Sequence, residues 1–233
     1  MSYQLAVSLK QILDMPYYKN EAARSGTVVH GHEDAIAAVL DQNGFDRITD
    51  FQTSSSLYFL YSDPDSRQSS MKFLFPNLRP GSYIAQPAGS NDFPDFLIHD
   101  FNDRFVMLEA KSGNGASIAW NDNLPKTDVI YVFSSGSHNE TTIFLGQDVL
   151  DPRQTQIIDE LRDEIDILVR KANSALMEND GKNRGWNYYP RPKFQQLQGR
   201  QARKSMLKIE RVNYFKHPDR DECELRALEF AGA

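Results

Sequence analysis

The stretch Phe93–Gly113, FPDFLIHDFNDRFVMLEAKSG, contains two apolar runs separated by a polar segment. The polar segment, HDFNDR, is rich in Asp and Asn, which tolerate turn conformations, so the pattern predicts two strands joined as a hairpin. Asp95 stands on the first strand, and Glu109 and Lys111 alternate with apolar residues on the second. Because successive side chains of a strand point to opposite faces, we expect Glu109 and Lys111 to share one face.

Two carboxylates beside an ammonium group have a definite chemical use. Carboxylate oxygens bind hard divalent cations such as Mg²⁺, and a neighbouring lysine orients a water molecule. The alternative is an ordinary ion pair on a solvated strand face, since surface pairs contribute little.

The spacing of these residues resembles a known signature. Pro94-Asp95, thirteen intervening residues and then Glu109-Ala110-Lys111 is similar to the motif of the PD-(D/E)XK nucleases, the superfamily that includes most Type II restriction endonucleases. The resemblance implies a restriction-endonuclease-like core of the α/β (α+β) class, in which a mixed β-sheet is flanked by helices in the order αβββαβ. Periodicity alone supports only an α/β or α+β chain.

The resemblance also implies roles for the residues. Asp95 and Glu109 would each give Mg²⁺ a carboxylate oxygen, the carbonyl of Ala110 would complete the protein's share, and Lys111 would orient the attacking water. Asp92 and Asp100 are rivals of Asp95 for the first carboxylate, but Asp95 is the position that matches the family's pattern.

A fourth catalytic group is expected from a helix earlier in the chain. The segment 24–45, RSGTVVHGHEDAIAAVLDQNGF, resembles the helix that many members of this superfamily place beside the site, and Glu33 is the matching position. The alternative is that Glu33 is a carboxylate favoured in the first turn of a helix by the helix dipole.

The same segment carries a competing motif. His30, His32 and Asp34 have the HxHxD spacing of a binuclear metal site. Hydrolases with that motif need a histidine directly after the aspartate, where this chain has Ala35. The remaining histidines lack a ligand context, so we favour the carboxylate site.

Size and composition indicate a globular protein. The chain has 233 residues, of which 40% are hydrophobic and 11% aromatic, enough for a single nuclease domain spanning 1–233. The N-terminal segment lacks the features of a signal peptide and no apolar run is long enough for a membrane span, so we expect a cytoplasmic protein without membrane contact. Cys223 is the only cysteine, which excludes a disulfide framework and a thiolate metal site.

The net charge of −6 conceals a separation of charge. Residues 181–216 contain ten Lys or Arg and one acid, Glu210, and therefore carry +9, which leaves −15 for the rest of the chain. A basic segment in an acidic chain is typical of a nucleic-acid surface, and a solvated basic helix is the alternative.

Two polar segments are candidates for contact with DNA, because amides, cations and aromatic rings read base edges, bind phosphates and stack on bases. For Trp186 and the tyrosines, packing in the core is an equal alternative. The first segment follows the Glu-x-Lys strand, and the second is the aromatic part of the basic segment; together they offer Asn114, Ser117, Asn121, Asn123, Lys126, Arg184, Trp186, Asn187, Tyr188, Tyr189, Arg191 and Lys193.

Hydrophobic periodicity predicts the remaining elements. The strongest helix is 151–177, where Ile157, Leu161, Ile165, Leu168, Ala172 and Ala175 follow helical spacing and Asp151-Pro152 suits a cap. The pattern predicts other helices at 2–15, 31–42 and 195–211, and strands at 57–61, 96–98, 105–111, 129–133 and 142–145.

We therefore expect a Mg²⁺-dependent, sequence-specific endodeoxyribonuclease of a restriction-modification system. A palindromic duplex read by a homodimer is the natural arrangement, because the symmetries match. The rivals are a structure- or modification-directed DNA nuclease of the same fold, acting in repair or junction resolution, and a catalytically inactive DNA-binding protein.

Overall fold

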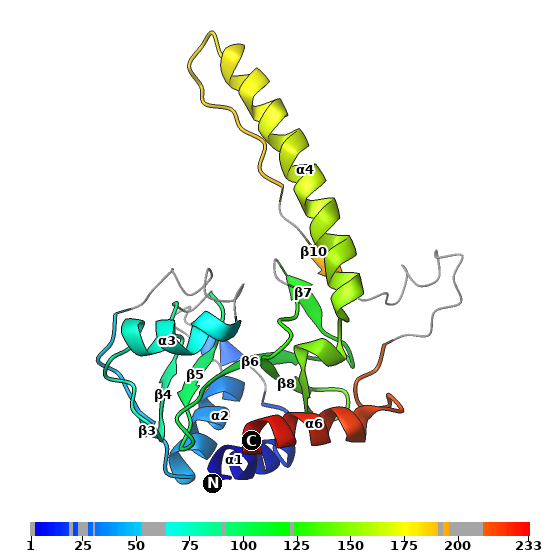
Figure 1. The fold of residues 1–233 in the computed structure, drawn as a ribbon. Helices are drawn as coiled ribbons and strands as arrows, with labels where there is room; N and C mark the ends of the chain where they lie inside the picture. Colours follow the sequence, from blue (N-terminus) through cyan, green and yellow to red (C-terminus); the bar gives the residue numbers. More distant parts are fainter. Residues whose placement is uncertain are drawn as a thin grey trace.

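The computed structural model describes residues 3–18, 21–22, 28–29, 31–52, 64–89, 92–121, 124–190, 193–195 and 212–233. It is a mixed α/β structure built on a six-stranded sheet (Figure 1). The strands of this sheet, in spatial order, are β3 (Asp46–Arg47), β4 (Ser82–Ala85), β5 (Phe96–His99), β6 (Phe105–Gly113), β8 (Ile130–Ser135) and β9 (Glu140–Leu145).

The pairing of these strands is mixed. β4, β5 and β6 form an antiparallel meander, β8 lies parallel to β6, and β9 returns antiparallel to β8. The predicted hairpin is confirmed: the Asp100 carboxylate accepts bonds from the backbone N–H groups of Asn102 and Arg104, both at 2.9 Å, and closes the turn between β5 and β6. The predicted strands at 96–98, 105–111, 129–133 and 142–145 are confirmed with small shifts of their ends.

Both faces of the sheet are buried. Residues of β6 alternate between them, so Val106 and Leu108 belong to one core cluster and Phe105 and Met107 to the other. Helices α1 (Gln4–Leu13), α2 (Gly31–Gln42) and α6 (Arg220–Gly232) cover the first face (Figure 1). The second face is covered by α3 (Pro64–Leu74) and by the segments around Trp120 and Phe215.

The helix predicted at 31–42 has those bounds, and the one predicted at 2–15 is α1. Several described elements were not predicted: helices α3 and α6, the 3₁₀ helix Gly146–Asp148, and the strands β1 (Glu21–Ala22), β2 (Val28–Val29), β3, β4, β7 (Ala119–Asn121) and β10 (Lys193–Gln195). The helix predicted at 195–211 is wrong at its first residue, since Gln195 ends strand β10; the rest of that helix and the strand predicted at 57–61 lie outside the described residues.

The connection from β6 to the parallel strand β8 differs from the αβββαβ order. The described residues of this connection include the short strand β7 (Ala119–Asn121) and contain no helix. β7 pairs with β10, Trp120 opposite Phe194.

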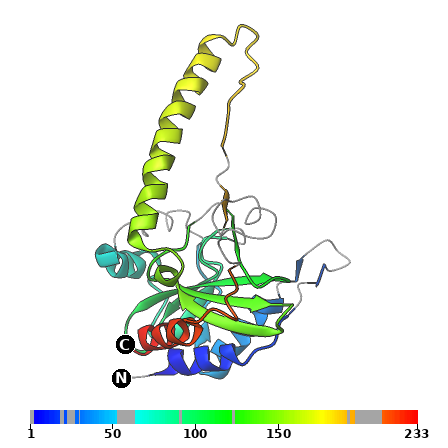
Figure 2. The ribbon, with the colours of Figure 1, turned by 90° about the vertical axis from the view of Figure 1, so that its right-hand side faces the viewer.

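The strongest predicted helix is confirmed as α4 (Pro152–Glu178), capped by the Asp151 side chain, which accepts from the N–H groups of Arg153 and Gln154 at 2.8 and 2.9 Å. It leaves the body of the protein as an arm, and residues 181–190 run back beside it toward β10 (Figures 1 and 2). Among the described residues, no helix has the length and apolar character that crossing a bilayer requires.

Candidate active site

The predicted site forms where β5 and β6 separate. β5 begins at Phe96, opposite Leu108, whereas β6 continues to Gly113 and pairs there with β8. Asp95 therefore stands at the end of the shared ladder, opposite Glu109. The Ala110 N–H donates to Asp95 Oδ2 at 2.7 Å, and the Asp95 N–H donates to Glu109 Oε2 at 3.2 Å. These bonds bring the two carboxylates of the motif together across the strands.

Lys111 completes the arrangement on the same face of β6. Its Nζ donates to Glu109 Oε1 at 2.5 Å, and its side chain is 30% exposed whereas that of Glu109 is 11% exposed. Lys111 thus links a buried carboxylate to the solvent-accessible side of the site.

Burial and mutual repulsion disfavour the ionised forms of the Asp95 and Glu109 carboxyl groups. Desolvation, followed by the negative charges of Glu109 and Glu33, raises the pKa of Asp95 from 3.8 to about 8, while the Ala110 N–H and Lys111 oppose the rise. Burial likewise raises the pKa of Glu109, against the effect of Lys111 and the Asp95 N–H. The site therefore favours the protonated form of its carboxylates, and a divalent cation would favour their ionised form.

Glu33 lies close enough to act on both carboxylates, because its charge raises both of their pKa values. It stands in the first turn of α2, and Glu33 Oε2 accepts a bond from Gln86 Nε2 at 3.1 Å. The structure therefore brings Glu33 to Asp95 and Glu109.

Gln86 is a site residue that sequence reasoning missed. It follows β4, its backbone N–H donates to the Asp95 carbonyl at 2.7 Å, and its φ of 52° is uncommon for a residue other than glycine. Gln86 thereby joins the end of β4 to Asp95 and to Glu33. Its only signal in the sequence is its place after the short apolar run of β4, a strand that was not predicted.

The donors present are hard oxygen ligands of the kind that Mg²⁺ prefers. A residue on an extended strand directs its N–H and C=O to the same side, so the Ala110 carbonyl faces the side on which Ala110 N–H meets Asp95. Asp95, Glu109 and Ala110 thus fit the predicted set of two carboxylates and one carbonyl.

No group of three or more His, Cys, Asp or Glu side chains placed to hold a metal ion occurs in the described part of the chain. Glu33 is accordingly a neighbour of the two carboxylates and not a third ligand in this structure. The rival motif gains no support either: His32 is 2% exposed, burial lowers its pKa to about 4 against a weak contact with the Val132 backbone, and His30 is outside the described residues.

The two alternatives to Asp95 for the first carboxylate lie in different surroundings. The Asp100 carboxylate is occupied in the hairpin turn, where Oδ2 also accepts two bonds from the Arg104 guanidinium at 2.9 and 2.7 Å. Asp92 is exposed.

The residues expected to read DNA fall into two groups. Asn114 is exposed just after β6, Ser117 is half-buried, and Lys126 is half-buried with its backbone N–H bonded to Tyr131 Oη at 2.8 Å. The backbone of Asn121 lies in β7, but its side chain, like the whole of Asn123, is outside the described part.

The second group lies on the returning side of the arm. Trp186, Tyr188 and Tyr189 are 75%, 59% and 81% exposed, which excludes the core-packing alternative for these rings. Arg184 and Asn187 are exposed too. Arg191 and the side chain of Lys193 are not among the described residues.

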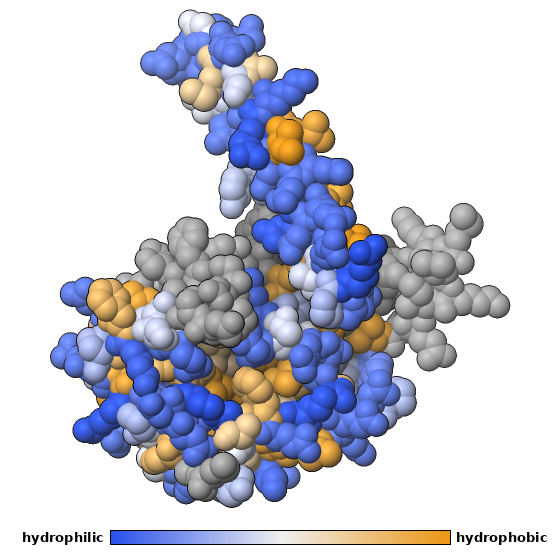
Figure 3. Space-filling model, in the orientation of Figure 1, coloured by the Kyte–Doolittle hydropathy of each residue, from blue (hydrophilic) through white to orange (hydrophobic). Residues whose placement is uncertain are grey.

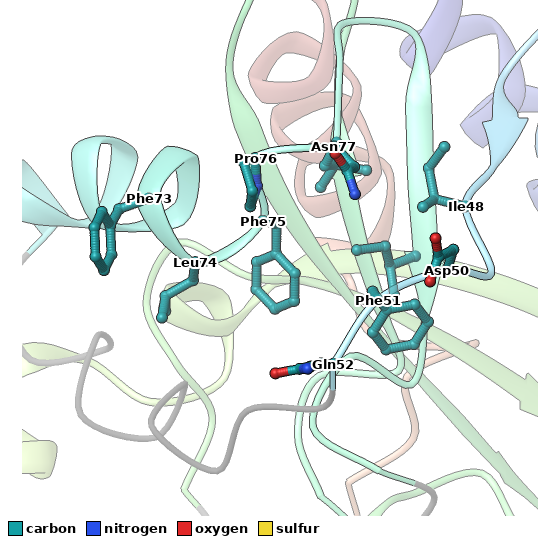
Figure 4. Close-up of a pocket in the computed structure, with 11 residues that line it drawn as sticks. Ile48, Asp50, Phe51, Gln52, Phe73, Leu74, Phe75, Pro76 and Asn77 are labelled. Carbon is teal, nitrogen blue, oxygen red and sulfur yellow. The ribbon is translucent and has the colours of Figure 1, made fainter.

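A separate cavity of about 420 Å³ opens beside β4 (Figure 4). None of the candidate site residues lines it. Its walls come from segments 48–52 and 73–78 together with Ile84, and they combine apolar side chains with a few polar ones: Ile48, Asp50, Phe51, Gln52, Phe73, Leu74, Phe75, Pro76, Asn77, Leu78 and Ile84.

Comparison with known proteins finds no match. No family model matches the chain, and neither the curated proteins nor the solved structures contain a match.

Proposed function

We propose that this protein is a Mg²⁺-dependent endodeoxyribonuclease of the PD-(D/E)XK type. The observation that carries the proposal is the meeting of Asp95, Glu109 and Lys111 where β5 and β6 separate, with Ala110 N–H bonded to Asp95. The succession of α2, an antiparallel meander and a strand parallel to its last member supports the core that the resemblance implies. The absence of a helix from the described residues of the connection to β8 is a departure from it.

In the proposed chemistry, Asp95, Glu109 and the Ala110 carbonyl hold the metal. Bound Mg²⁺ supplies Lewis acidity toward the scissile phosphate and lowers the pKa of a water molecule. Lys111 orients the water and offers positive charge to the phosphate oxygens as negative charge grows on them. Glu33 acts as the fourth catalytic group, by accepting a hydrogen bond from a water at the site.

Double-stranded DNA is the proposed substrate. The +9 charge of residues 181–216 in an otherwise acidic chain, together with the exposed rings at Trp186, Tyr188 and Tyr189, supports it. We propose sequence-specific cleavage by a homodimer in a cytoplasmic restriction-modification system. Cleavage directed by DNA structure or modification is the alternative within the same fold.

The test is digestion of a plasmid of known sequence with Mg²⁺ and with EDTA, followed by sequencing of the ends. Fixed cut positions support the restriction enzyme, and cuts confined to junctions or modified bases support the alternative. Asp95→Ala, Glu109→Ala and Lys111→Ala should each abolish cleavage and leave DNA binding largely intact, because these residues act on metal and water and not on bases.

Asp46→Ala is a matched control, since it removes an exposed carboxylate that pairs with Arg79 at 3.3 Å. Cleavage by Glu109→Ala at the wild-type rate would refute the proposed site. Binding without cleavage by the wild type at any metal concentration would favour the inactive DNA-binding protein.

A further inference from the structure

Helix α4 is long and has no buried residue. It contains 27 residues and is therefore about 40 Å long. Figures 1 and 2 show it leaving the body, and among the described residues the returning segment 181–190 runs beside it. In proteins, a helix usually owes most of its stability to an apolar face that is packed against a partner.

Such an apolar face is present and lies open. Ile157, Leu161, Ile165 and Leu168 are 53%, 54%, 39% and 65% exposed, and Figure 3 shows apolar side chains recurring along the arm. Ala172 and Ala175 extend the same face toward the tip and are exposed as well. An exposed apolar stripe of this length, on a helix that projects from the body, indicates a surface that another molecule covers.

The returning chain does not cover this stripe. Asn173 fixes the return by accepting from the Tyr188 N–H at 2.7 Å and donating to the Tyr188 carbonyl at 2.9 Å. On the helical wheel Asn173 lies with Arg162 and Val169, which are half-buried, on the side next to the stripe.

The charge of α4 argues against DNA as the occupant. The helix carries six acidic and four basic residues, a net charge of −2: Arg153, Asp159, Glu160, Arg162, Asp163, Glu164, Asp166, Arg170, Lys171 and Glu178. A surface that binds the phosphate backbone needs an excess of cations.

The spacing of the apolar residues is that of a coiled-coil seam. Leu161, Ile165, Leu168, Ala172 and Ala175 of the exposed stripe, preceded by the half-buried Ile158 at its edge, follow one another at steps of three and four residues. This spacing places the six residues at alternating a and d positions over almost three heptads. We propose that the occupant is a second copy of this chain, whose α4 lies antiparallel along the first.

The antiparallel arrangement is favoured by the sizes of the facing side chains. With the two-fold axis between Asp166 and Ile167, the layers match a large residue with a small one at both ends. Ile158 meets Ala175 of the second copy and Leu161 meets its Ala172, while Ile165 meets its Leu168 at the centre. Large-with-small layers fill a seam evenly, whereas a parallel register would place alanine against alanine.

The charged residues that flank the seam also favour the antiparallel arrangement. In the same register Glu164 lies beside Lys171 of the second copy, and the symmetry repeats the pair on the other side of the axis. In a parallel pair these g positions face e positions, which are Val169 and Leu176. The inference does not rest on the proposed nuclease activity, since mass and not cleavage is the readout.

The experiment measures the mass of the full-length protein by sedimentation over a range of concentrations. We expect the wild type to move from one chain, 26.6 kDa, to two chains as its concentration rises. Leu168→Glu places a charge in the central layer and should weaken the dimer about 100-fold. A wild type that stays at one chain at every concentration overturns the proposal.

Ile167→Glu is the matched control. Ile167 is 59% exposed, is a neighbour of Leu168 in sequence and points away from the seam, because successive helical residues are turned by about 100°. It should dimerise as the wild type does, and circular dichroism should show equal helix in both variants. Equal weakening by Ile167→Glu and Leu168→Glu overturns the assignment of the seam.

A charge exchange tests the orientation. Glu164→Lys alone and Lys171→Glu alone each place like charges side by side in the antiparallel pair and should weaken it several-fold, and the double variant should recover wild-type affinity. Single variants without effect overturn the antiparallel register.

Discussion

At the scale of single residues, Asp95 links pH to both folding and metal binding. Its pKa is about 8 in the folded protein against an ordinary 3.8, so between these values the folded state holds a proton that the unfolded chain has released. The contribution of Asp95 to stability is therefore complete below pH 3.8 and is lost as the pH rises through 8.

We expect the free energy of unfolding in EDTA to fall from pH 6 to pH 9, and to fall less in Asp95→Asn, which has no proton to lose there. Added Mg²⁺ should restore stability at pH 9 in the wild type alone, because metal binding needs the ionised carboxylate. Urea unfolding at the two pH values measures both effects. Equal slopes in wild type and variant would show that Asp95 titrates normally.

Glu33 allows a second prediction at this scale. Glu33→Gln keeps an oxygen that can accept from Gln86 and removes the charge that raises the pKa values of Asp95 and Glu109. If Glu33 acts on a water at the site, the single-turnover cleavage rate should fall about 100-fold, with the protein no less stable.

The alternative for Glu33, a helix-start role, predicts the reverse pattern: an unchanged rate and a loss of about 0.3–1 kcal/mol in stability. Comparing the rate with the thermal midpoint separates the two. Asp34→Asn, in the same helical turn, serves as the control for the dipole effect.

At the scale of elements, Arg104 joins the β5–β6 hairpin to the end of α6. Its guanidinium donates to the buried Asp100 carboxylate and also to the carbonyls of Phe230 and Ala231, at 3.0 and 3.2 Å. Arg104→Ala leaves a buried carboxylate without its cation and removes the donor to the carbonyls of Phe230 and Ala231 in α6.

We expect Arg104→Ala to lower the free energy of unfolding by about 3 kcal/mol, at the low end for broken buried pairs because Arg104 remains partly exposed. Lys72→Ala, which removes an exposed pair with Asp103, should cost less than about 1 kcal/mol. Equal losses in denaturant titrations of the two variants would contradict a buried role for Arg104.

At the scale of the whole molecule, the separation of charge predicts how DNA affinity responds to salt. Affinity should fall steeply with ionic strength, and Lys193→Ala should reduce the slope by about one while weakening all sequences alike. Arg184→Ala or Arg191→Ala, where the arginine is bidentate to guanine, should cost about 1–3 kcal/mol at the specific site and much less on random DNA.

Titrations of cognate and random duplexes at several salt concentrations measure these effects. Arg79→Ala, a cation paired with Asp46 on the body, is the control. Unchanged affinity and salt slope in all three variants of the basic segment would remove it from the DNA interface.

The sequence by itself determined the elements whose signals are local. α2 has the bounds that its periodicity and the Asn43-Gly44 stop predict, and α4 begins at its Asp151-Pro152 cap. The hairpin follows from the Asp100 turn, and two-residue periodicity puts Glu109 and Lys111 on one face. These features depend on neighbouring residues, so a single sequence is enough to predict them.

Only the tertiary structure decided the features that join distant segments. β4 is a strand because it pairs with β5. α6 has no strong apolar stripe in its sequence, and it packs on the core through the small residues Ala227 and Ala231. Gln86 and Glu33 reach Asp95 through the ends of β4 and α2, a meeting that no spacing predicts. The stripe of α4 shows the converse: periodicity identifies an apolar face, but whether the chain itself covers that face depends on long-range packing.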